Sequence, residues 1–136
     1  MILIDTTPLV ALCDARDRQH RTALKHLEAL STAVFCTCEA VLMETCFHLP
    51  HRAQRARLRA VLDSLQITPL SGSGDGFWFE VLEWLVKYAD HEPDWGDGCI
   101  AVLSGHHASL KVWTYDRRFR TTWRKPNGAL IPMAPI

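Results

Sequence analysis

Met1-Ile2-Leu3-Ile4-Asp5 opens the chain with three consecutive apolar side chains after Met1, followed at once by a carboxylate. A continuous apolar run of this kind is typical of a strand that is buried on both faces, as in a parallel sheet covered by helices. Ligands of open parallel sheets bind outside the carboxyl ends of the strands. The run therefore predicts a buried strand with Asp5 at the edge where a ligand would bind.

The rest of the chain alternates short apolar runs with longer amphipathic segments, which favours an α/β fold. Further strands are expected at residues 34–36, 66–70 and 111–115, with a short edge strand at 130–133. Helices are expected at residues 8–15, 20–30, 40–47, 51–65, 75–88 and 94–107. Thr7 before Pro8 and Asp75 before Phe77 are expected N-caps. Together these elements predict a single domain over residues 1–136, with a central parallel sheet of four to five strands covered by helices on both faces.

Composition narrows the class of protein. Apolar residues make up 48% of the 136 residues, which excludes a disordered chain. Lys plus Arg and Asp plus Glu number 15 each, so only local patches can indicate a nucleic-acid partner. No apolar run approaches the length of a membrane span, and the start lacks the basic region of a signal peptide. Five cysteines without a Cys-x-x-Cys pair fit reduced thiols, so we expect a cytoplasmic protein.

Four acidic residues follow or interrupt apolar segments. Asp5 and Asp116 each come directly after a predicted strand, Asp97 lies in the first turn of a predicted helix, and Glu44 interrupts an apolar helical segment. Carboxylates that converge at ~4 Å repel by about 4 kcal/mol at an effective dielectric constant of ~20, so they take up protons or bind a cation. Such oxygen ligands select Mg²⁺ or Mn²⁺, which polarise a phosphoryl oxygen and activate a water for phosphodiester hydrolysis.

Each of these acids also has a purely structural interpretation. Asp5 and Asp116 could begin turns, and Glu44 could pair with a nearby Arg. Asp94 and Asp97 have the spacing of an acidic capping box. For Asp94, capping alone and metal binding remain equally open, whereas Asp97 can serve both roles at once.

The segment around Asp116 is basic and contains a hydroxyl at a strand position. Thr114 would point to the same face as Asp116, where its hydroxyl could hold a carboxylate or a water. No acid follows Asp116, and the cations after it are candidates for phosphate contacts. They are Arg117, Arg118, Arg120, Arg124 and Lys125. Trp123 could stack on an unpaired base, but a core or dimer role is at least as compatible with its position.

Four pieces of sequence, in this order and at these distances, resemble the PIN domain family and, within it, the VapC-type toxins of bacterial toxin–antitoxin pairs. The pieces are Ile4-Asp5-Thr6 with Pro8-Leu9-Val10, Glu44, Asp94-Trp95-Gly96-Asp97-Gly98 with Ile100-Ala101-Val102-Leu103, and Thr114-Tyr115-Asp116-Arg117-Arg118-Phe119. The resemblance covers essentially the whole chain.

The resemblance implies a Mg²⁺-dependent endoribonuclease in which Mn²⁺ can substitute. The four conserved acids of the family correspond to Asp5, Glu44, Asp97 and Asp116 in this sequence. Asp94 matches an additional acid found in part of the family, and Thr114 matches the Thr or Ser before the last acid. Proteins of this type often form homodimers, and a cognate antitoxin blocks the acidic groove. This sequence departs from the family at Gly98, where many members have Ala, and at the bulky Trp95.

Two other functions remain open at this point. One is the same fold acting as an RNA- or partner-binding module with weak or no nuclease activity. The other is a phosphatase of the haloacid-dehalogenase type with Asp5 as nucleophile, which would need a second Asp where the chain has Thr7. The filled acidic positions argue against the first, and Thr7 argues against the second.

Overall fold

The computed structural model describes residues 1–72, 74 and 76–136, and the predicted N-cap Asp75 lies outside them. The strands of the described residues are β1 (Ile2–Ile4), β2 (Phe35–Thr37), β3 (Thr68–Pro69) and β4 (Lys111–Trp113). The helices are α1 (Thr6–Cys13), α2 (His20–Ala29), α3 (Glu39–His48), α4 (Arg52–Ser64), α5 (Gly76–Lys87), α6 (Trp95–His106) and α7 (Arg118–Thr121), with a 3₁₀ turn at Ala89–His91.

The four strands form one parallel sheet in the order β3-β2-β1-β4. β1 pairs on both sides, so that Leu3 lies opposite Cys36 of β2 and Val112 of β4. Leu3 and Ile4 are fully buried, as the uninterrupted apolar run predicts. Because all four strands run in the same direction, their carboxyl ends meet at one edge, and the predicted fold class is confirmed.

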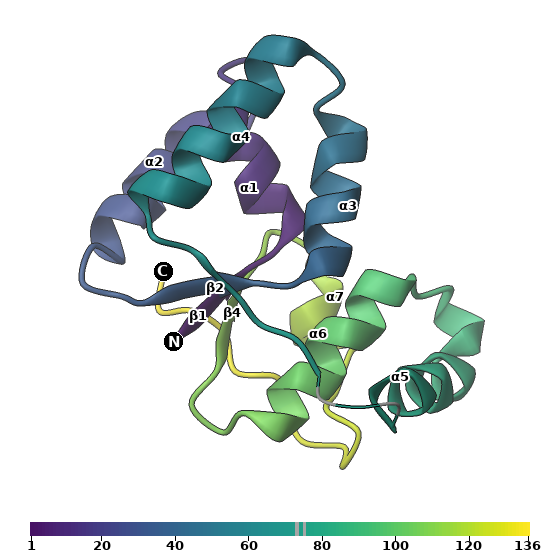
Figure 1. Cartoon of the computed structure of the whole chain (residues 1–136). Helices are drawn as coiled ribbons and strands as arrows, with labels where there is room; N and C mark the ends of the chain where they lie inside the picture. The colour runs from purple at the N-terminus through teal and green to yellow at the C-terminus, as the bar shows by residue number, and fades with distance from the viewer. Residues whose placement is uncertain (73, 75) are drawn as a thin grey trace.

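Helices cover both faces of this sheet (Figure 1). In that view α1 to α4 lie on one side, and α5 to α7 lie on the other. α6 is the innermost of the second group, since every residue from Asp97 to Ser104 is buried, and α5 packs against it. None of the described helices is both long and apolar enough to cross a bilayer.

The first helix begins earlier than predicted. Asp5, rather than Thr7, occupies the N-cap position, and the Asp5 carbonyl accepts the hydrogen bond of the Leu9 amide at 3.2 Å. Pro8 then lies in the first turn, where backbone N–H groups have no intrahelical acceptor, so the missing N–H of Pro8 costs no hydrogen bond. The turn from strand to helix therefore falls on the acid itself.

The predicted edge strand at 130–133 is reduced to an isolated bridge. Met133 pairs in parallel with Val112, and the Val112 amide donates to the Pro132 carbonyl at 2.8 Å. The Ala134 amide donates back to the Val112 carbonyl at 2.8 Å, but Pro132 cannot extend the ladder beyond this bridge, because it lacks an N–H. The sheet of the described residues therefore has four strands and one short edge contact.

Close packing of α5 on α6 depends on Gly98. A Cβ atom at this position would lie 2.9 Å from Val81 Cγ1 and 3.3 Å from Trp84 Cε3. Both contacts are tighter than ordinary van der Waals contacts, so α5 approaches α6 where no side chain intervenes. The departure from the family pattern at Gly98 thus has a packing reason, which is the bulk of Trp84 and Val81 on the facing helix.

Trp123 belongs to the core. It is fully buried and packs edge-on against Trp84, with ring centroids 5.3 Å apart, and against Tyr88 at 5.7 Å. Stacking of Trp123 on an RNA base is therefore excluded, and the core interpretation is confirmed. The adjoining helix α7 was not predicted, because four residues anchored by one buried side chain, Phe119, carry no periodic pattern.

Candidate active site at the carboxyl edge of the sheet

Asp5 lies at the junction of β1 and α1, where it is only 8% exposed. Its carboxylate makes no capping hydrogen bond to α1, and Oδ2 instead accepts one of 2.7 Å from Thr114 Oγ1. Burial raises the pKa of Asp5 to about 6, although hydrogen bonds from Thr114 and the Thr6 amide lower it, and the charges of Glu44 and Asp116 raise it further. A carboxylate opposed by both burial and like charges favours uptake of a proton or a cation.

The end of β4 reaches Asp5 because β4 is the parallel neighbour of β1. Ile4 lies opposite Trp113, and the Asp5 amide donates to the Trp113 carbonyl at 3.0 Å. The next residue, Thr114, is buried, and its hydroxyl donates to Asp5 while accepting the Asp116 amide at 3.0 Å. Thr114 therefore bridges Asp5 and Asp116, as its predicted strand position suggests.

Asp94 and Asp97 form the predicted acidic capping box at the start of α6. Asp94 Oδ1 accepts the Asp97 amide at 2.8 Å, and Asp97 Oδ2 accepts the Asp94 amide at 3.1 Å. Burial raises the pKa of Asp97 to about 7, with the Asp94 amide and the Arg118 charge lowering it and the charges of Asp94 and Asp5 raising it. Asp97 is only 7% exposed, and the charge of Asp5 raises its pKa, so both carboxylates belong to one cluster.

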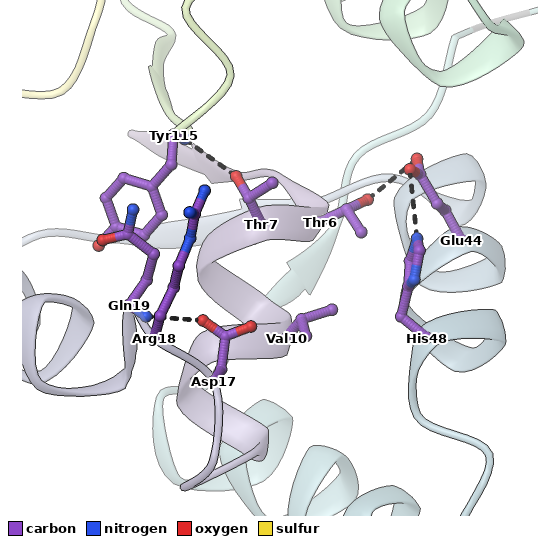
Figure 2. A pocket seen from close by; sticks show the side chains of 9 residues that line it. All are labelled: Thr6, Thr7, Val10, Asp17, Arg18, Gln19, Glu44, His48 and Tyr115. Atoms are coloured by element: carbon purple, nitrogen blue, oxygen red, sulfur yellow. Dashed lines mark hydrogen bonds and ion pairs between the residues drawn. The ribbon is translucent and has the colours of Figure 1, made fainter.

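Glu44 approaches the cluster from α3. Its Oε2 accepts a hydrogen bond of 3.2 Å from Thr6 Oγ1, and its Oε1 lies 3.9 Å from His48 Nε2 (Figure 2). A Cβ atom at Gly96 would lie 3.7 Å from Glu44 Oε2 and 3.3 Å from Asp94 Oδ1, so Glu44 and Asp94 face each other across Gly96. No Arg pairs with Glu44 among the described residues, and that alternative for Glu44 is not supported.

Arg118 lies inside the acidic cluster. Its guanidinium contacts both oxygens of Asp116, with Nη2 2.8 Å from Oδ2 and Nε 3.2 Å from Oδ1, and Nη2 is also 3.8 Å from Asp97 Oδ2. Burial acts to raise the pKa of Asp116, but the hydrogen bonds and charge of Arg118 hold it below its usual value. The sequence predicted Arg118 as an RNA contact, whereas the structure places its guanidinium on two of the acids.

The other predicted RNA contacts are spread along the chain after Asp116. Arg117 and Arg120 are exposed, and Arg124 and Lys125 are half-buried. Arg124 Nη1 donates to the Trp123 carbonyl at 2.8 Å, which ties its side chain to the backbone. Arg117 and Arg120 are therefore more accessible than Arg124 and Lys125, and their role remains a prediction.

The acids brought to this edge are Asp5, Glu44, Asp94, Asp97 and Asp116. In the part of the chain that the structure describes, no three His, Cys, Asp or Glu side chains are already arranged to hold a metal ion. The donor chemistry still fits Mg²⁺ or Mn²⁺, because every candidate ligand is a carboxylate and Asp5 has no cation partner among the described residues. Binding would require side-chain rearrangement, above all of Arg118.

Two residues of this edge stand in the family motifs, but the sequence predicts no role for them. Thr6 positions Glu44 through its hydroxyl, and Gly96 leaves room between Glu44 and Asp94. Arg118 was found, but with a different partner. The spacing of Asp116 and Arg118 carries a usable signal, because the Asp116 side chain accepts the Arg118 amide at 2.9 Å in a local turn.

Comparison with known proteins agrees with this architecture. A family model described as the PIN domain matches residues 2–124. The crystal structure of VapC20 of Mycobacterium tuberculosis, a toxin that cleaves the sarcin–ricin loop, is similar with a TM-score of 0.71 at 24% identity, over 93% of this chain and 98% of that chain. At that identity the likeness shows a shared fold. No curated protein matches the chain significantly. Since the family model spans nearly the whole chain, the protein belongs to the PIN domain family.

Proposed function

We propose that the protein is a Mg²⁺-dependent endoribonuclease, the toxin component of a VapBC-type toxin–antitoxin pair acting in the cytoplasm. The observation that carries this proposal is the buried carboxylate of Asp5, whose pKa is raised to about 6 by burial first and then by Glu44 and Asp116. A fold has no structural need for buried acids of this kind, because Asp5 and Asp97, whose pKa values are raised, cost stability at neutral pH. A bound divalent cation removes that cost.

The residues proposed to hold the metal are Asp5, Glu44, Asp97 and Asp116, with Asp94 as a further candidate. The bound ion would supply an activated water and polarisation of the scissile phosphoryl oxygen. Thr114 holds Asp5 in place through its 2.7 Å hydrogen bond, and Thr6 orients Glu44 in the same way. Arg117, which directly follows Asp116, and Arg120 are exposed and are proposed to bind the RNA backbone.

The proposal includes two protein partners. A cognate antitoxin would block the acidic groove, as the family resemblance implies. A second copy of the chain is proposed to cover exposed apolar side chains on α5 and α3. The most exposed of these are Phe47, Val86, Met43, Trp78 and Phe79.

Cleavage of RNA by the purified protein tests the activity. Wild-type protein is expected to cut RNA with Mg²⁺ or Mn²⁺ and to stop when EDTA is added. Asp5→Asn and Asp97→Asn are expected to fold and to lose cleavage. The matched control is Asp63→Asn, which removes an exposed carboxylate of α4 and should cleave as wild type does. A folded Asp5→Asn variant that still cuts RNA would overturn the proposal.

Growth of the expressing cell tests the toxin assignment separately. Expression of the wild-type chain is expected to arrest growth, and Asp116→Ala is expected to relieve the arrest because it removes a proposed metal ligand. Growth arrest that persists with Asp116→Ala at equal protein levels would argue against a toxin acting through this site.

The alternative is a PIN-fold module that binds RNA or a partner without cutting. One observation favours it, namely that Arg118 already neutralises Asp116 and lies 3.8 Å from Asp97. Under this alternative, RNA binding would be unaffected by EDTA and no cleavage would occur with any divalent ion.

A further inference from the structure

A cavity of about 300 Å³ opens directly beside the acidic cluster, between the start of α1, the turn after it and the end of β4 (Figure 2). Thr6 and Glu44 belong both to its wall and to the acidic edge described above. Its size lies at the lower end of ligand pockets, which suits one nucleoside rather than an oligomer. A nucleoside bound in the cavity would therefore lie directly next to the acids of the proposed cleavage site.

Tyr115 forms a fixed aromatic wall of this cavity. Its hydroxyl bonds His26 Nδ1 at 2.8 Å and accepts from Trp113 Nε1 at 3.2 Å, while its amide donates to Thr7 Oγ1 at 2.9 Å. The ring is thus held at both ends. It also sits between Thr114 and the next acid in the chain, so its position relative to the acids is set by β4. A rigid aromatic surface of this kind is what unpaired bases stack on.

Arg18 supplies a cation at the same cavity. Figure 2 shows its side chain running alongside the cavity toward Thr7 and Tyr115. Among the described residues Arg18 has no ion-pair partner, and its neighbour Asp17 is occupied by the Gln19 amide at 2.8 Å. An exposed, unpaired guanidinium beside an aromatic ring can bind one phosphate in bidentate fashion.

The charge of the cavity wall argues for a neutral base with a single phosphate. Among the residues that line the cavity, Arg18 is a cation and Asp17 and Glu44 are carboxylates, so the wall offers a phosphate one cationic contact. A polyphosphate would be repelled by the carboxylates of Asp17 and Glu44. A nucleobase would instead contact the Tyr115 ring, and its single phosphate would contact Arg18.

We propose that this cavity is a nucleoside subsite for the nucleotide next to the scissile phosphate, with the base stacked on Tyr115 and an adjacent phosphate bound by Arg18. The Gln19 carboxamide, which also lines the cavity, contacts the edge of the base. The substrate class is RNA with an unpaired nucleotide at the cleavage site, because a base inside a duplex cannot enter. This inference rests on the proposed nuclease function and adds the part of the site that selects the substrate.

The test compares Arg18→Ala with Arg16→Ala. Both are exposed arginines of the same turn, but only Arg18 lines the cavity. With a short fluorescent oligoribonucleotide as substrate, Arg18→Ala is expected to raise KM about tenfold with kcat within about twofold, as loss of one charged phosphate contact predicts. Arg16→Ala should match wild type. Equal KM values for the two variants would overturn the phosphate contact.

Stacking is tested by Tyr115→Leu and Tyr115→Phe with substrates that carry an abasic ribose at one position at a time. Tyr115→Leu is expected to lower kcat/KM by about 5-fold to 150-fold, which is the range of base–aromatic stacking energies. Tyr115→Phe keeps the ring and is expected to retain most of the wild-type kcat/KM. With the abasic site at the one flanking position that enters the cavity, wild type and Tyr115→Leu should become equal. A loss with Tyr115→Leu that is the same at every abasic position would contradict the subsite.

Two further measurements keep this inference separate from the proposed function. The rise in melting temperature caused by Mn²⁺ should be unchanged in the Arg18 and Tyr115 variants, which shows that their acidic cluster is intact. If the wild type cleaves no RNA, the proposed activity fails. The subsite is then judged by fluorescence anisotropy of the same oligonucleotides in the Asp97→Asn background. Weaker binding by Arg18→Ala and Tyr115→Leu would support the subsite, and unchanged binding would overturn it.

Discussion

Thr114 Oγ1 donates a 2.7 Å hydrogen bond to Asp5 Oδ2 and so joins the end of β4 to the end of β1 across 109 residues of sequence. Thr114→Val keeps the shape of the side chain but leaves the buried carboxylate without this donor. The free energy of unfolding at pH 7 is expected to fall by about 1–3 kcal/mol. Thr114→Ser retains the hydroxyl and should stay near wild type in denaturant unfolding. Equal stabilities of the Val and Ser variants would show that the bond contributes nothing.

Stability in EDTA is expected to fall as the pH rises from about 4 to 7. Asp5 has a pKa of about 6 and Asp97 of about 7 in the folded protein, both above the usual value of 3.8. Below pH 3.8 these groups are protonated in both states. Above it the unfolded chain releases its protons first, which favours unfolding until the folded pKa is passed.

For Asp5 alone the loss is on the order of 2–3 kcal/mol. Asp5→Asn removes this charge, so its curve of unfolding free energy against pH should be flatter and higher at pH 7. Unfolding in urea at several pH values, with EDTA present, measures both effects. A wild-type protein that becomes more stable over this pH range would contradict the raised pKa of Asp5.

Arg118 forms ion pairs with Asp116 and Asp97, two of the proposed metal ligands. Its removal is expected to lower the Mg²⁺ concentration at the midpoint of metal-induced stabilisation about two- to fivefold, because a half-exposed ion pair contributes roughly 1 kcal/mol or less. Arg118→Met is the suitable change, since it keeps an apolar stem near the Trp123 ring, 5.1 Å from the guanidinium. Arg120→Met serves as the control on the same helix. A midpoint that rises with Arg118→Met would mean that Arg118 assists metal binding.

Gly98→Ala is expected to destabilise the protein by about 1–3 kcal/mol, the usual effect of overpacking. The new methyl group would lie 2.9 Å from Val81 Cγ1, and this clash outweighs the gain in helix propensity of up to ~1 kcal/mol. Val81→Ala alone is also destabilising because Val81 is fully buried, but the double variant Gly98→Ala with Val81→Ala should lose less than the sum of the two single losses, because the clashing methyl group is gone. Thermal unfolding of the single and double variants decides the point. A Gly98→Ala variant as stable as wild type would show that α5 moves aside freely.

Local patterns explain why much of the fold could be predicted. The apolar run before Asp5 predicts a buried parallel strand, and Asp94 with Asp97 predicts a helix start through the spacing of a capping box alone. Each of these two signals is local, because the residues that make it lie within a few positions of one another in the sequence. By contrast, segment 130–133 looks like a strand but forms one bridge, because Pro132 cannot donate a hydrogen bond.

Partners that are distant in sequence account for what could not be predicted. The cavity of Arg18 and Tyr115 joins residues 97 positions apart, and no pattern on either segment points to the other. Arg118 is an exception, because its charge alone predicts an RNA contact although its partner Asp116 lies only two positions away. Trp123 lies in no periodic apolar segment, and its partner Trp84 is 39 positions earlier, so no local pattern predicts their contact.

Titration with Mn²⁺, followed by isothermal calorimetry, tests most directly the claim that the acids at the end of β1 form a divalent-cation site. Wild-type protein and the Asp63→Asn control are expected to show the same saturable binding, and Asp5→Asn and Asp97→Asn are expected to lose it while remaining folded. Equal Mn²⁺ affinity in wild type and Asp5→Asn would contradict the claim.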